Sequence, residues 1–214
     1  MTRLPGTPRA ALVLLGLLAL DVPSTSSLTS PLASPLAAQD RTAVFAGGCF
    51  WGIEAVFEHV KGVRTAVSGY AGGIFPDPTY ELVSAGISGH AEAVRVTYDP
   101  AQVSYAELLA VFFNAHDPTQ LDRQGPDVGS QYRSAVFFAD EEQEGEALAA
   151  IARLTAERAF RREIVTEVTP LETFYLAEAY HQDYLIHHMD QPYIVINDLP
   201  KLDDLKRAFP ALYR

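Results

Sequence analysis

From Arg41 to Gly62 the chain reads RTAVFAGGCFWGIEAVFEHVKG, the most informative segment of the sequence. Its first part, Thr42–Ala46, is a short apolar run, which predicts a buried strand entering a tight turn at Gly47-Gly48. Apolar residues then recur at helical spacing over residues 53–60, and the glycine at 62 is a typical stop signal. The segment therefore predicts a strand, a glycine turn and a helix.

Predicted strands and helices continue to alternate along the chain. Ser104 and Glu107 form a capping box that predicts the start of a helix, and Asp140 is a candidate cap for another. The pattern predicts strands at 63–70, 91–98, 134–139 and 164–168, a long loop at 74–90, helices at 104–116, 140–161 and 174–188, and a tail from 191. Two consecutive strand–helix–strand units predict an α+β, two-layer sandwich: a ferredoxin-like βαββαβ core with an added C-terminal helix and tail.

Composition limits the function classes that fit. The chain has 214 residues, 48% of them hydrophobic, which suits one globular domain. Its formal charge is −11, and so acidic a chain is a poor partner for nucleic acid, whose binding depends on Lys and Arg. No glycine loop of the phosphate-binding type is present, so the sequence indicates no bound cofactor.

The first forty residues differ from the rest. Arg3 and Arg9 precede the apolar run Ala10–Leu20, and small residues follow up to Ala38. This order is typical of a signal peptide, and the run is too short to span a bilayer. We expect residues 1–38 to be a signal peptide, residues 39–214 to be a single catalytic domain, and the mature protein to be extracytoplasmic, periplasmic or secreted. A disordered leader or a wrong start codon is the alternative.

Cys49 is the one cysteine in the chain. Such a residue is either a buried apolar side chain or a reactive thiol. Its position in the first turn of a helix, behind two glycines, exposes the sulfur to unpaired N–H groups and the positive end of the helix dipole. We therefore expect a lowered thiol pKa and a reactive thiolate. Phe50 and Trp51 follow, and one or both are expected to line an apolar pocket beside the sulfur.

Five motifs in order give the chain a recognisable signature. They are Gly48-Cys-Phe-Trp-Gly52, Pro78-Thr-Tyr80, Gly89-His-Ala-Glu92, Asp127 followed by Gln131-Tyr-Arg-Ser134, and Tyr180-His-Gln-Asp-Tyr-Leu185. Together they resemble the motifs of the peptide methionine sulfoxide reductase A family, from about residue 41 to the end of the chain. The resemblance implies thiol-dependent reduction of methionine S-sulfoxide, free or in proteins, and hence repair of oxidised proteins.

The resemblance also implies a role for each motif residue. Cys49 would be the nucleophile and Glu92 the proton donor. Tyr80 and Tyr132 would hydrogen-bond the sulfoxide oxygen. The substrate-binding residues would be Phe50 and Trp51, which hold the methyl group, and Asp127, which makes a polar contact or binds a water.

These residue types suit the chemistry. A sulfoxide sulfur is a poor electrophile until its oxygen is protonated or hydrogen-bonded, so attack by Cys49 needs an acid such as Glu92 in an apolar site. The product is a Cys49 sulfenic acid. Relatives often carry a second cysteine to resolve it, but this chain has Ser84 before the acid motif and no cysteine near Arg214. We therefore expect recycling by an external thiol: a thioredoxin-like protein, a glutaredoxin or a small thiol.

Three other interpretations remain open at this point. A metal site could be imagined among the residues His181, Asp183, His187, His188 and Asp190, although no zinc spacing matches. Cys49 paired with His90 or His116 would suit a hydrolase that forms an acyl-enzyme. The Phe50-Trp51 pair could instead serve a non-catalytic binding module. We expect no stable membrane insertion after cleavage and a monomeric enzyme.

Overall fold

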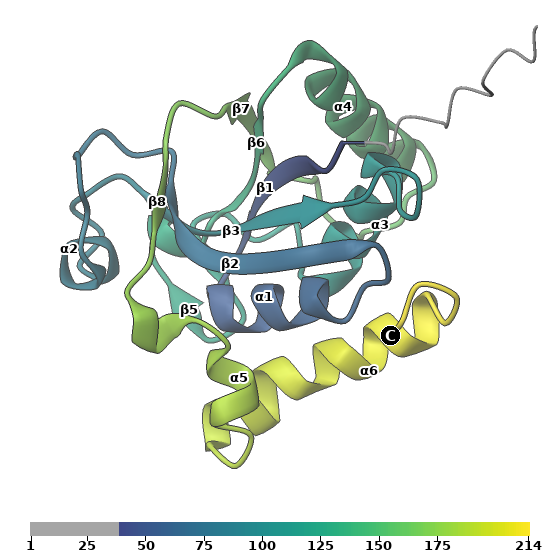
Figure 1. Ribbon diagram of the computed structural model, residues 1–214. Helices are drawn as coiled ribbons and strands as arrows, with labels where there is room; N and C mark the ends of the chain where they lie inside the picture. The colour runs from purple at the N-terminus through teal and green to yellow at the C-terminus, as the bar shows by residue number, and fades with distance from the viewer. Residues whose placement is uncertain (1–38) are drawn as a thin grey trace, which may run out of the picture. The chain divides into compact units, whose positions relative to one another are not determined.

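A computed structural model describes residues 39–214, so the predicted signal peptide lies outside the described residues. The main sheet has six strands in the order β7-β6-β1-β3-β2-β8 (Figure 1). Their bounds are β1 Arg41–Gly47, β2 Val63–Ala71, β3 Ala91–Tyr98, β6 Ser134–Phe138, β7 Glu167–Pro170 and β8 Phe174–Leu176. A two-stranded ribbon is formed by β4 (Arg123–Gln124) and β5 (Asp127–Val128).

The central four strands confirm the predicted ferredoxin-like core. β3 lies between β1 and β2 and is antiparallel to both, and β6 is antiparallel to β1 on its other side. With α1 (Phe50–Glu58) after β1 and α3 (Tyr105–Ala115) after β3, the chain follows the βαββαβ order. β7 extends the sheet in parallel beyond β6, and β8 extends it in antiparallel beyond β2.

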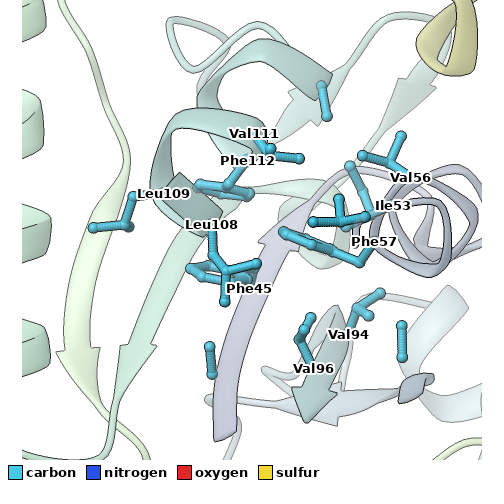
Figure 2. Packing of buried hydrophobic residues seen from close by; sticks show 14 of the residues in the cluster. Phe45, Ile53, Val56, Phe57, Val94, Val96, Leu108, Leu109, Val111 and Phe112 are labelled. Carbon is cyan, nitrogen blue, oxygen red and sulfur yellow. The ribbon is translucent and has the colours of Figure 1, made fainter. Parts of the chain in front are cut away.

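Strand alternation places one face of the sheet against the helices. On β1, Phe45 is fully buried and its ring stacks on Phe57 of α1 at 5.2 Å and on Phe112 of α3 at 5.0 Å. Figure 2 shows these side chains together with Val94 and Val96 of β3. The side chains of this cluster hold α1 against the sheet, and with it the residue at its first turn.

The predicted helix starts are confirmed where a side chain caps the backbone. Ser104 and Glu107 make the predicted capping box at α3. Asp140 accepts a hydrogen bond from the Gln143 amide at the start of α4 (Glu141–Ala156). The predicted loop at 74–90 contains one short helix, α2 (Tyr80–Ser84).

The helix predicted over residues 174–188 is wrong. The segment holds β8, the 3₁₀ turn η2 (Ala179–His181) and the short helix α5 (Tyr184–His187). Beyond β8, the Gln182 side chain accepts from the Ser68 amide at 3.0 Å and donates to the Ser68 carbonyl at 3.1 Å, as a strand backbone would. Asp183 then adopts a left-handed φ of 53°, which interrupts any helix.

The predicted tail is more ordered than its sequence suggested. It forms a π-helical turn η3 (Ile194–Asp198) that continues into α6 (Leu199–Ala208). α6 packs on α1, which lies between it and the sheet (Figure 1). Within residues 39–214, no helix has the length and apolar character needed to cross a membrane.

Candidate active site

The turn at Gly47-Gly48 places Cys49 at the N-cap of α1. Gly48 has a φ of 94°, and a Cβ there would lie 2.6 Å from the Gln124 side chain, so only glycine fits. Cys49 follows with 7% of its surface exposed. The predicted position of the thiol at the start of the helix is confirmed.

Glu92 lies on β3 and is 2% exposed. Its Oε2 accepts a hydrogen bond from the Phe50 amide at 3.0 Å, so the carboxyl group is tied to the residue that follows Cys49. Burial raises the pKa of Glu92 to about 8, and the charges of Asp127 and Asp198 act in the same direction against the opposing effect of the Phe50 amide. The carboxyl group is thus largely protonated at neutral pH.

The expected lowering of the Cys49 pKa is wrong. Burial raises the pKa of the thiol well above its ordinary value, and the carboxylates of Glu92 and Asp198 add to this. The Lys201 ammonium and the Trp51 amide act in the opposite direction but do not outweigh the loss of solvation. The resting site therefore holds a protonated thiol and a protonated carboxyl group within electrostatic reach of each other.

Two phenols lie within electrostatic reach of this pair. Tyr80 begins α2, where its amide donates to Glu178 Oε1 at 2.9 Å, and Tyr132 ends the 3₁₀ turn η1 (Ser130–Tyr132). Burial raises the pKa of Tyr80 to about 12, and burial also raises that of Tyr132. The charges of Glu92 and Cys49 add to the effect of burial in both shifts, so both phenols keep their protons.

Asp127 lies on β5 in a tightly bonded segment. Gln124 accepts from the Asp117 amide at 3.2 Å and donates to the Asp117 carbonyl at 3.0 Å, and the Gly125 amide donates to Gln120 at 2.9 Å. Asp127 in turn accepts a hydrogen bond from the Tyr193 hydroxyl. These bonds tie the segment that carries Asp127 to residues 117–120 and to Tyr193, and the Gln124 side chain lies against Gly48.

Tyr193 is a site residue that the sequence analysis missed. Its ring meets Trp51 edge-on at 6.1 Å, and its pKa is raised by burial and then by the Cys49 charge. It lies in the tail, and the sequence does not indicate which distant residues its side chain contacts. The motifs around Cys49 and Asp127 gave no signal for it.

The two aromatic residues after Cys49 have different environments. Phe50 is 1% exposed and packs on Tyr70 and His181. Trp51 is half-buried, its ring stacks on Tyr184 at 3.8 Å, and its Nε1–H donates to His181 Nδ1 at 3.1 Å. His181 and Tyr184 thus fix the orientation of the Trp51 ring.

The histidines of the hydrolase interpretation are bonded elsewhere. His116 is buried with a pKa lowered to about 4 by burial, and its ring nitrogens contact the Phe112 carbonyl and the Ser134 hydroxyl. His90 accepts from the Gly73 amide and contacts the Phe75 carbonyl. Neither ring is left to act as a base for Cys49.

The histidines of the imagined metal site do not share one helix. His181 lies in η2 and His187 in α5, while His188 follows α5 and stacks on Tyr184. In the part of the chain that the structure describes, no group of three or more His, Cys, Asp or Glu side chains is arranged to hold a metal ion.

Comparison with known proteins settles the family. Residues 41–211 match the family model of the peptide methionine sulfoxide reductases. The chain belongs to the peptide methionine sulfoxide reductase family. The family assignment made from the five motifs, and with it the enzyme class, is confirmed.

Individual relatives agree with this family. MsrA 2 of Mesorhizobium japonicum is 53% identical over 81% of this chain and 89% of its own length. MsrA of Deinococcus radiodurans is 49% identical over 87% of this chain and 92% of its own. The structure of yeast Mxr1 in reduced form has a TM-score of 0.68 at 33% identity, covering 72% of this chain and 88% of that one. Methionine sulfoxide reductase A of Corynebacterium diphtheriae has a TM-score of 0.63 at 40% identity, covering 72% and 78%.

Proposed function

We propose that this chain reduces methionine S-sulfoxide to methionine, with Cys49 as nucleophile and Glu92 as proton donor. The observation that carries the proposal is the bond from the Phe50 amide to Glu92, which fixes a protonated carboxyl group at the residue that follows the thiol. A sulfoxide oxygen that receives this proton makes the attached sulfur electrophilic. Family membership supports the same reaction.

The remaining motif residues bind the substrate. Tyr80 and Tyr132 donate hydrogen bonds to the sulfoxide oxygen while keeping their protons, because their pKa values lie above the neutral range. Trp51 and Phe50 enclose the methyl group, and Asp127 provides a polar contact through its carboxylate or a bound water. The family name supports peptide-bound substrates, and hence a role in repair of oxidised proteins.

Oxygen transfer leaves a sulfenic acid. The Cys49 sulfur attacks the substrate sulfur, the oxygen passes to Cys49, and the thiol proton ends on that oxygen through Glu92. The products are methionine and Cys49–SOH. The sequence holds no second cysteine, so an external thiol must reduce Cys49–SOH with release of water. A thioredoxin-like protein, a glutaredoxin or a small thiol can supply the electrons, and no bound cofactor takes part.

A single turnover without reductant tests the proposal. The protein is mixed with one equivalent of N-acetyl-methionine S-sulfoxide, and released N-acetyl-methionine and the intact protein mass are followed. We expect product release with one oxygen added at Cys49, and no reaction of Cys49→Ser or with the R epimer. Dithiothreitol alone should then restore turnover. No product and an unchanged mass from folded protein would contradict the proposal.

We also propose that residues 1–38 direct the enzyme out of the cytoplasm as a cleaved signal peptide, leaving a monomeric catalytic domain from residue 39. The basic start and short apolar run support the signal peptide. Expression of the full chain in a bacterium, followed by cell fractionation and N-terminal sequencing, tests it. We expect the enzyme in the periplasmic fraction with a new N-terminus near residue 39, and intact cytoplasmic protein would contradict the proposal.

A further inference from the structure

Asp198 and Lys201 form a buried ion pair at the start of α6. Asp198 is fully buried, and its Oδ1 accepts a hydrogen bond from Lys201 Nζ at 2.9 Å. The Lys201 side chain is 16% exposed. The other carboxylate oxygen, Oδ2, is buried and has no hydrogen-bond partner among the described residues. Burial of such an ion pair costs desolvation free energy, which its mutual attraction does not always recover.

The pair lies directly against the first turn of α1. A Cβ added to Gly52 would lie 2.2 Å from Asp198 Oδ1 and 2.6 Å from Lys201 Nζ. Gly52 is three residues after Cys49, so its missing side chain is what allows the two charges to approach the thiol end of the helix. The glycine of the motif is thus explained by a contact with the C-terminal segment.

The pair is part of the charge environment of Cys49. The Asp198 carboxylate opposes ionisation of the thiol and the Lys201 ammonium favours it. The other groups that face Cys49 come from different elements: Glu92 on β3, Tyr80 on α2, Tyr132 on η1 and Tyr193 before η3. Among these groups Lys201 is the sole cation, and Asp198 binds it.

We propose that Asp198 and Lys201, which lie against Gly52 in the first turn of α1, are positioning residues that balance the charge at Cys49. Asp198 adds to the burial that keeps the resting thiol protonated, and it offsets the pull of the Lys201 ammonium toward a thiolate before substrate arrives. A protonated thiol resists adventitious oxidation, because the thiolate is the form that oxidants attack. The inference rests on the proposed function for the role of Cys49 as nucleophile, but the thiol's ionisation is measurable without any sulfoxide.

Opposite shifts in two charge variants test the proposal. The ionisation of Cys49 is followed by thiolate absorbance and by the pH profile of its alkylation with iodoacetamide, using intact mass. Asp198→Asn leaves an unbalanced ammonium and should move the profile about one pH unit lower. Lys201→Gln keeps a donor for Asp198 but removes the positive charge, and should move the profile about as far upward. The double variant should lie between the two.

Matched variants separate this from a structural role. Asp204→Asn breaks an exposed ion pair with Arg207 on the same helix and should leave the profile unchanged. Lys201→Arg keeps the charge and should restore the parent profile. If Asp198→Asn does not fold, the upward shift of Lys201→Gln and its rescue by arginine decide the matter. Shifts of both single variants in one direction, or none beyond the Asp204→Asn control, would overturn the proposal whether or not the chain reduces sulfoxides.

Discussion

The Phe50 amide donates to Glu92 Oε2 at 3.0 Å, which ties the buried carboxyl group to the residue after the thiol. Glu92→Gln keeps the shape and an acceptor for this bond but removes the acid. We expect the rate of methionine release in a single turnover to fall about a hundredfold or more, with alkylation of Cys49 retained. Glu54→Gln is the control, because Glu54 is equally buried but bonded to the Ser68 amide. Parental rates in Glu92→Gln would contradict the assignment.

The pH dependence of the oxygen-transfer step follows from the same group. The pKa of Glu92 is raised to about 8, so the protonated acid is abundant below that pH and is lost above it. We expect the single-turnover rate to decline as pH rises through about 8, and this decline to be absent in Glu92→Gln. If the rate still declined in that variant, the decline above about pH 8 would belong to another titrating group.

Two glycine variants test the contact between α1 and α6. Gly52→Ala places a Cβ 2.2 Å from Asp198 Oδ1, so we expect a loss of about 1–3 kcal/mol in the free energy of unfolding, despite alanine's higher helix propensity. Gly145→Ala in α4 meets nothing within 4 Å and should stabilise the protein by about 0.5–1 kcal/mol. Urea denaturation of both measures the difference. A stabilised Gly52→Ala would show that the two helices part easily.

The phenols are tested by removal of their hydroxyl groups. Tyr80→Phe and Tyr132→Phe should each slow methionine release about tenfold or more, because each removes one donor to the developing charge on oxygen. Tyr105→Phe is the control, since its buried hydroxyl has no hydrogen-bond partner in the described chain. Single-turnover rates decide the matter, and a double variant as fast as the parent would exclude the phenols from the reaction.

Trp51 is predicted to bind rather than to react. Trp51→Phe loses the hydrogen bond to His181 and part of the stack on Tyr184. We expect KM for N-acetyl-methionine sulfoxide to rise several-fold with little change in kcat. Steady-state kinetics with dithiothreitol measure both constants. A fall in kcat at constant KM would give Trp51 a part in the chemical step.

The sequence predicts the core because its signals are local. The strand–turn–helix at Cys49 and the capping box at Ser104 depend on neighbours along the chain, and both are confirmed. The helix predicted over residues 174–188 was wrong because the Gln182 side chain makes the bonds to Ser68 that the backbone of a neighbouring strand would make. The spacing of apolar residues in the sequence does not show that a side chain will make these bonds.

The candidate site could be predicted only in part, because its motifs are local but some of its contacts come from distant segments. The motifs name Cys49 and Glu92, but the pKa of the thiol depends on how deeply it is buried and on Asp198, which lies in the tail. Helix position alone predicted the wrong direction. Tyr193 was missed, and His181 was named without its bond to Trp51, because the contacts of these residues with Asp127 and Trp51 join distant parts of the chain.

The bonds that Gln124 makes to both sides of the Asp117 backbone have a consequence for substrate binding. A methionine side chain offers few atoms for contact, so its binding free energy is small. The ordering of a flexible loop on binding would cancel much of that free energy. Here that entropy is lost when the protein folds, before any substrate arrives. Under the proposed function, binding of an oxidised methionine side chain then loses no free energy to the ordering of the segment that carries Asp127.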